Sequence, residues 1–483
     1  MKPTVSMRDA LADPNLLAPA LPGKSWAAWR TMLIAIMGEP LTDAELEIFR
    51  RFTKRDAPPA ELVREAWFVI GRRGGKSRAI AVLTVYLACL CKHTRLVKGE
   101  TGVALVIAPD KKQARVILEY AVGIIEDSAL LRQTVVKRSA EELQLRGRIK
   151  IEVRSSSFRR IRGLTAIAVL ADECAFWLSE DSSNPDTEIL NAARPALATT
   201  GGPLVCISSP HARTGALWDT FKRDFGPEGD PAILVAHGTS RDFNPDLAQA
   251  IVDKALERDP AAASAEYLAE FRTDIEGFVT REAVEACVDR AVRERPFDCS
   301  KNYVAFTDPS GGASDAFTLA IAHNEGKTQV LDVIRERKPP FSPEAVVDEF
   351  CVLLKAYRIS TVDGDRYAGE WVAEAFRNKG IYYRPSEKPK SDIYVDLLPL
   401  INSGAVALLD NDRLALQLTQ LERCTARGGK DSIDHPRGGH DDVANSAAGS
   451  LVYAFRESGV YISDDEERSR PPNFSGADAW LSG

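Results

Sequence analysis

The sequence predicts an α/β protein with two separate sheets. Two groups of short, continuously apolar runs alternate with helical stretches, and the charged stretch 274–300, which has no such run, separates the two groups. Runs that are apolar on both faces are typical of buried strands, and their alternation with helices is typical of layered α/β domains. At the usual domain size, the 483 residues suffice for about two to four folding units.

The composition is that of a globular protein. Hydrophobic residues make up 45% and charged residues 27%, which excludes collagen-like and wholly disordered chains. The 62 basic and 69 acidic side chains give a net charge of -7. Binding of nucleic acid through overall positive charge is therefore disfavoured, but a local basic groove stays open, since residues 137–162 carry nine basic and three acidic side chains.

Cysteines and apolar runs indicate the compartment. The eight cysteines form no CxxC pair, so we expect reduced thiols in a cytosolic protein. The longest apolar run, 79–91, is shorter than the roughly 18 residues that a membrane helix needs, and the first 15 residues have no apolar signal core. We expect no membrane association.

The first group of predicted strands covers 66–71, 103–109, 167–173, 203–210 and 232–238. It is preceded by a proline-punctuated helical segment, 1–60, which we expect to pack on the domain at 61–273. Pairs of strands with short turns open the second group, which covers 302–310, 316–323, 328–337, 359–365 and 405–410 and favours a mixed sheet. The acidic, Pro/Gly/Ser-rich stretch 457–483 is predicted to be a mobile tail.

A glycine-rich turn follows the first strand and leads into an apolar helix. Backbone amides of such a loop can surround phosphates, while a lysine reaches the β- and γ-oxygens and a serine holds Mg²⁺. Ile70 stands where the full P-loop pattern has glycine, and an ordinary strand-to-helix turn is the alternative. The predicted nucleotide-binding residues here are Gly71, Arg72, Arg73, Gly74, Gly75, Lys76 and Ser77.

The residues that would contact the base of a nucleotide carry no motif. Three aromatic residues, Trp26, Trp29 and Trp67, are candidates. Packing in the core is the alternative for each of them, and it is the one we expect.

Two acids at the end of a later strand complete the predicted nucleotide site. Asp172 would hold the Mg²⁺ water shell, and Glu173 would orient and deprotonate the attacking water. Ser208 and Ser209, at the end of the next strand, are candidates for sensing the phosphate state, or else cap a turn. Arg162 is a candidate arginine finger, with contact to a DNA backbone as the alternative.

Acids also end the strands of the second group. Asp308 closes its first strand, Asp363 and Asp365 close a later one, and Asp441 and Asp442 begin an alanine-rich helix. Carboxylates converging from two strands and one helix can hold two divalent cations that cleave a phosphodiester. A helix N-cap and a loop aspartate are the alternatives. All five acids are candidate metal ligands, and the choice within each pair stays open; as catalytic residues we choose Asp308, Asp365 and Asp442.

The motifs GRRGGKS, VLADECAFW, ISSP, TDPSGGASD, VDGDRYAGEW and GGHDDVANSAAG occur in this order. Together they resemble the large terminase subunit of tailed double-stranded DNA bacteriophages, or a related prophage or gene-transfer-agent protein. The resemblance covers about residues 60–456. It includes the arginine at position 72, four residues before the lysine, in a deviant form of the P-loop.

This resemblance implies a P-loop (RecA/ASCE-like) ATPase domain at 61–273, a helical linker at 274–300 and an RNase H-like nuclease at 301–456. It implies an ATP-driven motor that packages viral DNA into a procapsid, and an endonuclease that cuts concatemers. The implied cofactors are ATP with one Mg²⁺ and two Mg²⁺ or Mn²⁺ ions in the nuclease. The implied partners are double-stranded DNA, the portal protein, the small terminase subunit and further copies in a ring, in the host cytoplasm and transiently on the procapsid.

Three other functions share some of these motifs. An ATP-dependent repair nuclease or helicase also joins a motor to a nuclease, but usually has a second P-loop-like half, which is not predicted here. An RNase H-like recombinase explains the acids of the second group but not the lysine and acids of the first. A non-enzymatic docking subunit is disfavoured because Lys76, Glu173 and Asp308 are all present.

Overall fold

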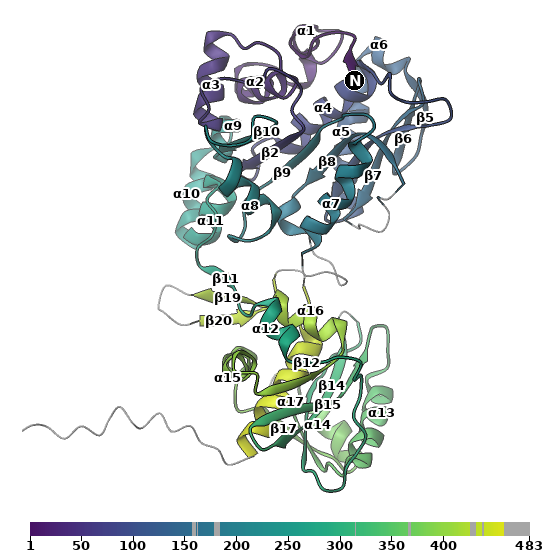
Figure 1. Cartoon of the computed structure of the whole chain (residues 1–483), viewed down its shortest axis with the longest axis vertical. Helices are drawn as coiled ribbons and strands as arrows, with labels where there is room; N and C mark the ends of the chain where they lie inside the picture. Colours follow the sequence, from purple (N-terminus) through teal and green to yellow (C-terminus); the bar gives the residue numbers. More distant parts are fainter. Residues whose placement is uncertain are drawn as a thin grey trace, which may run out of the picture. The chain divides into compact units, whose positions relative to one another are not determined.

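The computed structural model describes residues 1–156, 161, 163–177, 184–313, 315–365, 369–425, 431–436 and 439–457. The chain divides into two compact units (Figure 1). The first unit comprises Met1–Phe278 and Gln420–Gly439, and the second comprises Val279–Thr419 and His440–Gly483. Nearly all of the predicted tail lies outside the described residues. Within the described residues, no helix combines the length and the apolar character needed to cross a lipid bilayer.

The first unit is built on an eight-stranded sheet of order β10-β2-β9-β8-β4-β7-β6-β5. The strands from β10 to β7 are parallel, and β6 and β5 continue the sheet in antiparallel pairing. All five strands predicted in this unit are present. The strands are β2 (Glu65–Ile70), β4 (Gly102–Ala108), β5 (Val135–Arg138), β6 (Glu142–Leu145), β7 (Ile149–Ser155), β8 (Thr165–Asp172), β9 (Leu204–Ser208) and β10 (Ile233–Gly238).

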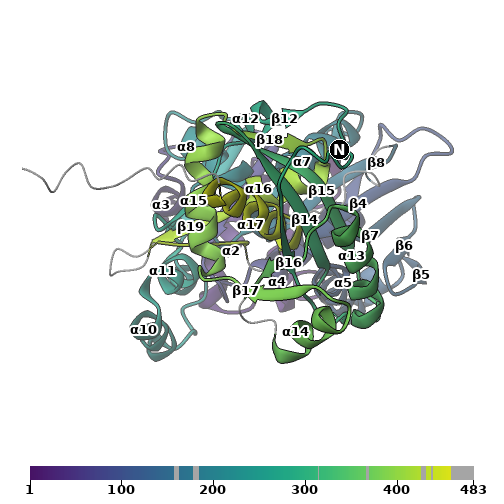
Figure 2. The same ribbon diagram turned by 90° about the horizontal axis from the view of Figure 1, so that it is seen from below.

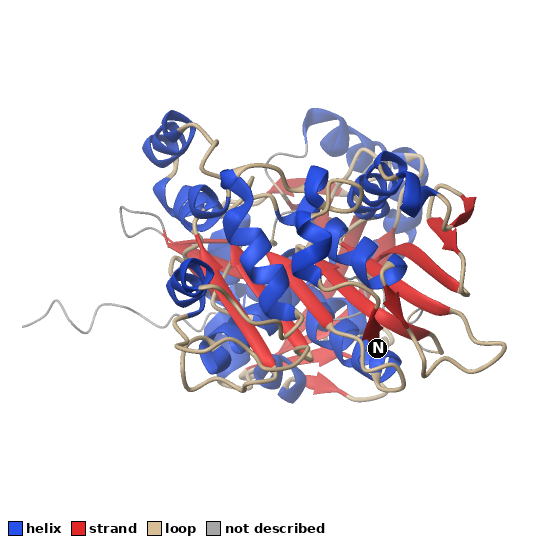
Figure 3. Cartoon of the chain, turned by 90° about the horizontal axis from the view of Figure 1, so that it is seen from above, coloured by secondary structure: helices blue, strands red, loops and turns tan. Residues whose placement is uncertain are grey.

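Alternate side chains of these strands fill two cores. Phe68 and Ile70 of β2 face one core, which also contains the amino-terminal helices, α4 and α5. Trp67 and Val69 face the other, which contains α7 and α8. Figure 3 shows helices, in blue, around the red strands. Since successive strand residues point to opposite faces, a strand covered on both faces must be apolar throughout. This three-layer arrangement explains the continuous apolar runs of the sequence.

Of the helices of the first unit, α4 to α8 lie between strands of the eight-stranded sheet in the sequence, α1 to α3 precede β2, and α9 to α11 follow β10. Thr42 and Glu45 form a capping box that starts α3, and Asp110 caps α5, as expected from the preference for such residues before a helix. The helices are α1 (Met7–Ala12), α2 (Ala27–Ile36), α3 (Asp43–Thr53), α4 (Lys76–Cys89), α5 (Lys111–Asp127), α6 (Ala129–Arg132), α7 (Pro185–Leu197), α8 (Gly215–Asp224), α9 (Ser240–Phe243), α10 (Gln249–Arg258) and α11 (Pro260–Leu268). Short 3-10 turns cover Ala18–Ala20, Lys24–Trp26 and Cys174–Phe176.

The second unit is built on a seven-stranded mixed sheet of order β12-β18-β15-β14-β13-β16-β17. Its strands β13, β14 and β15 form an antiparallel meander, while β16 pairs parallel to β13 and β17 parallel to β16. All five strands predicted here are present. The strands are β12 (Val288–Asp289), β13 (Tyr303–Asp308), β14 (Phe317–Glu325), β15 (Thr328–Arg337), β16 (Thr361–Gly364), β17 (Tyr382–Pro385) and β18 (Val406–Leu409).

Helices cover both faces of this sheet. One face packs against α13 and α14 around the buried Phe317 and Phe350. The helix α17 packs against β13, β14 and β15, and α15 packs against α17. Figure 2 shows α17 and α13 on opposite sides of β14 and β15. The helices are α12 (Arg281–Ala286), α13 (Pro343–Ala356), α14 (Gly369–Asn378), α15 (Lys390–Asn402), α16 (Asp412–Gln420) and α17 (Asp442–Glu457).

Two small sheets in the first unit were not predicted. β1 (Lys2–Pro3) pairs with β3 (Cys91–Lys92), and β11 (Ile275–Gly277) pairs with β19 (Glu422–Thr425), which in turn pairs with β20 (Asp431–Asp434). The stretch 274–300, expected to be a helical linker, therefore contains β11, α12 and β12. β11 has three residues and β12 has two, too few to show an alternating pattern in the sequence.

Gly449 of α17 gives a stability prediction. A Cβ atom at this position would lie 2.2 Å from Cγ of Phe306, which is buried in β13. We expect Gly449→Ala to lower the free energy of unfolding by about 1–3 kcal/mol, because a well-packed core does not accept an added methyl group. Urea unfolding followed by circular dichroism measures this change.

Gly123→Ala in α5 is the matched control. No atom lies within 4 Å of a Cβ built there, so the intrinsic helix preference for alanine should leave stability unchanged or raise it by up to about 1 kcal/mol. Equal unfolding midpoints for the two variants would contradict the close packing of α17 on β13.

Candidate nucleotide site and candidate metal centre

The carboxyl ends of β2, β8 and β9 meet at one edge of the first sheet. β9 lies between β2 and β8 and is parallel to both. The glycine-rich turn 71–75 follows β2, the pair Asp172–Glu173 ends β8, and Ser208–Ser209 ends β9. Parallel strands end at the same edge, so this order brings together three motifs that are far apart in the sequence.

Lys76 is the centre of this edge. Its side chain is only 6% exposed, and its ammonium group donates to the carbonyl oxygen of Ile70 (2.9 Å) and to Oγ of Ser209 (2.8 Å). Oε1 of Glu173 lies 3.3 Å from the same nitrogen. A buried ammonium is stable only when paired and hydrogen-bonded, and these contacts satisfy that requirement.

Ser208 and Ser209 connect β9 to the same carboxylate. Oε2 of Glu173 accepts hydrogen bonds from Oγ of Ser208 (3.1 Å) and from the backbone N–H of Ser209 (3.0 Å). Since Ser209 also accepts from Lys76, a change in the partners of either charged group would alter the contacts of both serines. The structure thus brings together four of the candidate site residues, Lys76, Glu173, Ser208 and Ser209.

Glu173 has an unusual backbone. Its φ of 47° and ψ of 46° lie in the left-handed region, which non-glycine residues rarely adopt. Its N–H still donates to the carbonyl of Ile207 in β9, at 2.7 Å. Such conformations cost about 1–3 kcal/mol and are concentrated at functional sites, where the surroundings hold them in place.

Asp172 is buried beside this network. Its Oδ2 accepts from Nε2 of Gln113, at 3.3 Å, whereas Oδ1 is buried without a hydrogen-bond partner among the described residues. Burial, together with the neighbouring Glu173 carboxylate, raises the pKa of Asp172 to about 7, against the opposing effects of Lys76 and Gln113. Gln113 was not predicted, because it comes from the start of α5 and carries no motif.

The glycine-rich turn is braced by the amino-terminal helical segment. Gly75 has a φ of +81°, and a Cβ atom there would also lie 2.9 Å from the ring of Trp26. Nε1 of the buried Trp29 donates to the carbonyl of Gly74, at 2.7 Å. These two tryptophans, and Trp67 as well, pack within or against the core, which is the alternative that we expected for them.

Residues that follow β10 form hydrogen bonds with the glycine-rich turn. Ser240 donates to the carbonyl of Arg72, and Asn244 donates through Nδ2 to the carbonyl of Arg73, at 2.8 Å. The Arg72 guanidinium lies 2.8 Å from a carboxylate oxygen of Glu266. Sequence patterns gave no signal for Ser240, Asn244 or Glu266. Ser77 lies half-buried in the first turn of α4.

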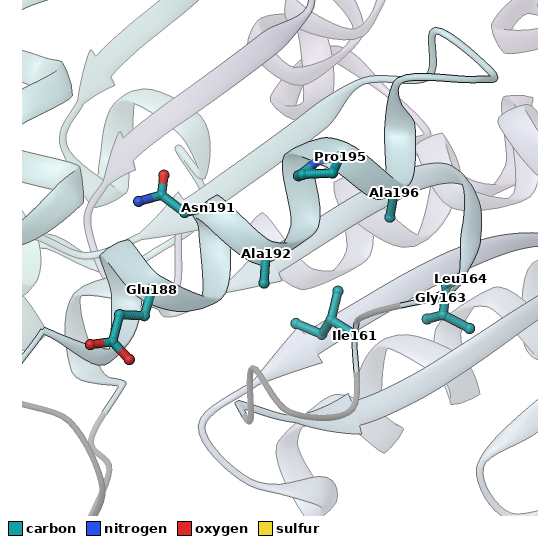
Figure 4. A pocket seen from close by; sticks show the side chains of 8 residues that line it. All are labelled: Ile161, Gly163, Leu164, Glu188, Asn191, Ala192, Pro195 and Ala196. Atoms are coloured by element: carbon teal, nitrogen blue, oxygen red, sulfur yellow. The ribbon is translucent and has the colours of Figure 1, made fainter.

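Arg162 lies outside the described residues. Its neighbours Ile161, Gly163 and Leu164, together with one face of α7, line a hollow of about 700 Å³ (Figure 4). Leu164 immediately precedes β8, whereas Asp172 ends that strand, so this hollow lies at the opposite end of β8 from the nucleotide site.

In the second unit, acids converge from two neighbouring strands and one helix. Asp308 ends β13, Asp365 directly follows β16, which is paired parallel to β13, and Asp442 begins α17, which packs on β13. Nδ2 of Asn445, also in α17, donates to Oδ2 of Asp308 at 2.8 Å, and the backbone N–H of Ala316 lies 3.4 Å from Oδ2 of Asp442. The structure thus brings these three predicted acids together.

Crowding of carboxylates changes their ionisation. Burial raises the pKa of Asp308 to about 8 against the opposing hydrogen bond from the Asn445 amide, and the charges of Asp442, Asp441 and Asp365 raise it further. Burial, followed by the charge of Asp441, also raises the pKa of Asp442. Such a group of acids is stable at neutral pH when it keeps protons or binds cations.

The other two predicted ligands already have strong partners. The Arg384 guanidinium donates to both carboxylate oxygens of Asp363, at 2.6 and 2.8 Å. Tyr394 donates to Oδ2 of Asp441 at 2.8 Å, and Nζ of Lys390 lies 3.0 Å from the same oxygen. Asp363 and Asp441 thus each have a basic side chain as a partner.

The strand order and sites define the class of the chain. In the first unit, one strand separates the P-loop strand from the acid-bearing strand, which is the arrangement of ASCE-type P-loop domains. In the second, the order β15-β14-β13-β16-β17, with acids at β13, β16 and α17, is that of an RNase H-like domain.

Comparisons with known proteins give similarity at the level of structure. No family model and no curated protein matches the sequence. The chain is similar to the large terminase of bacteriophage HK97 (16% identity, 90% of this chain and 100% of that chain, TM-score 0.38). It is also similar to the large terminase of a thermophilic bacteriophage in complex with ADP (13%, 85% and 98%, TM-score 0.37).

A third similar structure, the large terminase nuclease of thermophilic phage G20c with bound magnesium, matches a part of the chain (17% identity, 35% of this chain and 94% of that chain, TM-score 0.31). With identities and TM-scores this low, the three likenesses carry no argument about activity. The functional argument comes from the residues of the two sites.

The raised pKa of Asp308 gives a pH prediction. Its folded-state value of about 8 lies above the ordinary value of about 4, so the folded chain binds this proton more tightly than the unfolded chain. Stability of the metal-free protein should therefore fall as the pH rises from about 4 to about 8. In EDTA, Asp308→Asn should raise the Tm at pH 8 by a few degrees and leave it unchanged near pH 4.

Asp348→Asn on α13 is the control, because this carboxylate is 54% exposed and lies outside the acid group. Thermal unfolding in EDTA across this pH range makes the comparison. A Tm difference between Asp308→Asn and wild type that is independent of pH would contradict the raised pKa.

Proposed function

We propose that this chain is a large terminase subunit, an ATP-driven motor that packages viral double-stranded DNA into a procapsid and a metal-dependent endonuclease that cuts concatemeric DNA. One observation carries the proposal: a single chain contains a Lys76–Glu173–Ser209 network at a P-loop edge and an acid group at the carboxyl ends of β13 and β16. The first arrangement suits hydrolysis of a nucleoside triphosphate, and the second suits hydrolysis of a phosphodiester.

In the nucleotide site, each residue has a chemical task. The amides of the turn 71–75 and the amino end of α4 bind phosphate oxygens, and Lys76 neutralises their charge. Glu173 orients the attacking water and accepts its proton. The unpaired Oδ1 of Asp172 fits a water of a Mg²⁺ shell, and Ser77 is the expected Mg²⁺ ligand.

In the metal centre, the donor set fits hard divalent cations. Asp308, Asp365 and Asp442 supply only carboxylate oxygens, the ligands that Mg²⁺ and Mn²⁺ prefer. When bound, two such ions would activate water and stabilise the leaving oxygen of a phosphodiester. Asn445 orients Asp308, while Lys390 and Tyr394 fix Asp441 beside Asp442.

The mixed sheet of the second unit also supports this proposal over a helicase. In that sheet β14 is antiparallel to both of its neighbours, β13 and β15. The second unit is therefore not a second RecA-like half. An RNase H-like recombinase would not need the network around Lys76, which suits hydrolysis of a nucleoside triphosphate. Further proposals follow from the terminase assignment: assembly into a ring, binding to a portal protein and a small terminase subunit, and action in the host cytoplasm while transiently docked on the procapsid.

Separate loss of the two activities tests the proposal. Asp308→Ala should abolish cleavage of plasmid DNA in Mn²⁺ and leave ATP hydrolysis intact, because the acid group lies in a different unit from Lys76. Lys76→Ala should abolish ATP hydrolysis and leave the fold of the second unit intact. Gel analysis of the plasmid and a phosphate-release assay measure the two activities.

Asp348→Asn serves again as the control and should retain both activities. Wild-type protein that hydrolyses ATP but cuts no DNA in Mn²⁺ would refute the nuclease half. Cleavage that persists in Asp308→Ala would show that the acid group is not the catalytic centre.

Glu173→Gln should separate binding from chemistry. The amide keeps the size of the side chain but cannot accept the water proton, so we expect ATP hydrolysis to fall about 10²–10⁴-fold while ATP still binds. Calorimetric titration of MgATP and single-turnover phosphate release measure the two effects. A wild-type rate in this variant would exclude Glu173 as the base.

A further inference from the structure

A second hollow lies directly beside the P-loop. It has a volume of about 590 Å³ and is lined by Arg73, Asn244, Asp246, Leu247, Ile251 and Tyr267, among others. Arg73 belongs to the glycine-rich turn itself, while the other side chains come from the α9–α10 connection, α10 and α11. The hollow is thus within the size range of small-ligand sites and adjoins the predicted phosphate-binding turn.

Residues that line this hollow contact the glycine-rich turn directly. Asn244 donates to the carbonyl of Arg73 at 2.8 Å, and a Cβ atom on Gly71 would lie 2.7 Å from the carbonyl oxygen of Tyr267. Nε of Arg241 donates to the carbonyl of Leu247 at 3.0 Å, which fixes the α9–α10 connection. These contacts connect residues that line the hollow to the predicted phosphate-binding turn.

The chemistry of the lining suits a flat heteroaromatic group. Ile251, 50% exposed, and Leu247 offer aliphatic contact, and Tyr267 offers an aromatic ring. Asn244 and Asp246 add polar groups at the same place. An exposed isoleucine beside a phosphate-binding turn has no evident packing role, but it can cover one face of a base.

We propose that this hollow binds the nucleobase of the nucleoside triphosphate whose phosphates the turn 71–75 holds. The inference rests on the proposed ATPase function and adds to it the residues that contact the base. The tryptophans of the amino-terminal segment cannot take this role as readily. Trp29 is fully buried and hydrogen-bonded to Gly74, and Arg78 lies over the ring of Trp26, 5.2 Å from its centre.

Comparing two ligands, one with a base and one without, tests the proposal. Calorimetric titrations of the full chain with MgATP and with magnesium tripolyphosphate should be made for wild type, Ile251→Asp and Tyr267→Ala. We expect the variants to bind ATP roughly 5- to 100-fold more weakly, as loss of a base-stacking contact does. Their affinity for tripolyphosphate should equal that of wild type.

Leu130→Asp on α6 is the matched control, since this aliphatic side chain is 57% exposed and is not among the residues that line the hollow. It should bind both ligands like wild type. Unchanged ATP affinity in both hollow variants would overturn the proposal, and so would an equal loss for ATP and tripolyphosphate. A wild-type chain that binds neither ligand would instead reject the proposed ATPase function, and the base site with it.

Discussion

A lysine ammonium held away from water organises the first unit. Desolvating such a charge costs several kcal/mol unless partners replace the lost hydration. Here those partners come from the ends of β2, β8 and β9, so the charge is compensated only when the three strands are in register and end at one edge. The left-handed backbone of Glu173 and the burial of Ser208 follow from the same requirement, because each places an oxygen within reach of this network.

The second unit has the opposite electrostatic problem. Its acids repel one another, and the groups around them divide four of the five into two kinds. Arg384 neutralises Asp363, and Lys390 lies against Asp441, whereas Asp308 and Asp442 have raised pKa values. The repulsion that remains between these carboxylates favours the binding of external cations. The same unit thus contains carboxylates that form ion pairs and carboxylates whose pKa values are raised.

Much of this fold was predictable because the sequence patterns that indicate it are local. The strands were visible as apolar runs, and Lys76, Asp172, Glu173 and Asp308 stand beside strand ends that the same runs define. The roles of Trp29, Gln113, Asn244, Arg384 and Lys390 were not predictable. Each acts on a residue at least 21 positions away, so only the folded chain brings it to its partner. Asp363 illustrates the limit: the sequence placed it at a strand end, whereas its ion pair with Arg384 is seen only in the folded chain.

The three-stranded sheet of β11, β19 and β20 has a consequence for how such chains can be recombined. Residues 420–439 belong by their contacts to the first unit, although they stand between segments of the second. A gene fragment ending at codon 278 would therefore encode β11 without the strands that pair with it. Conversely, a contiguous gene fragment that encodes the whole second unit would also encode β19 and β20. The two halves of this protein are thus not independent modules at the level of DNA, and inheritance as one piece preserves the pairing.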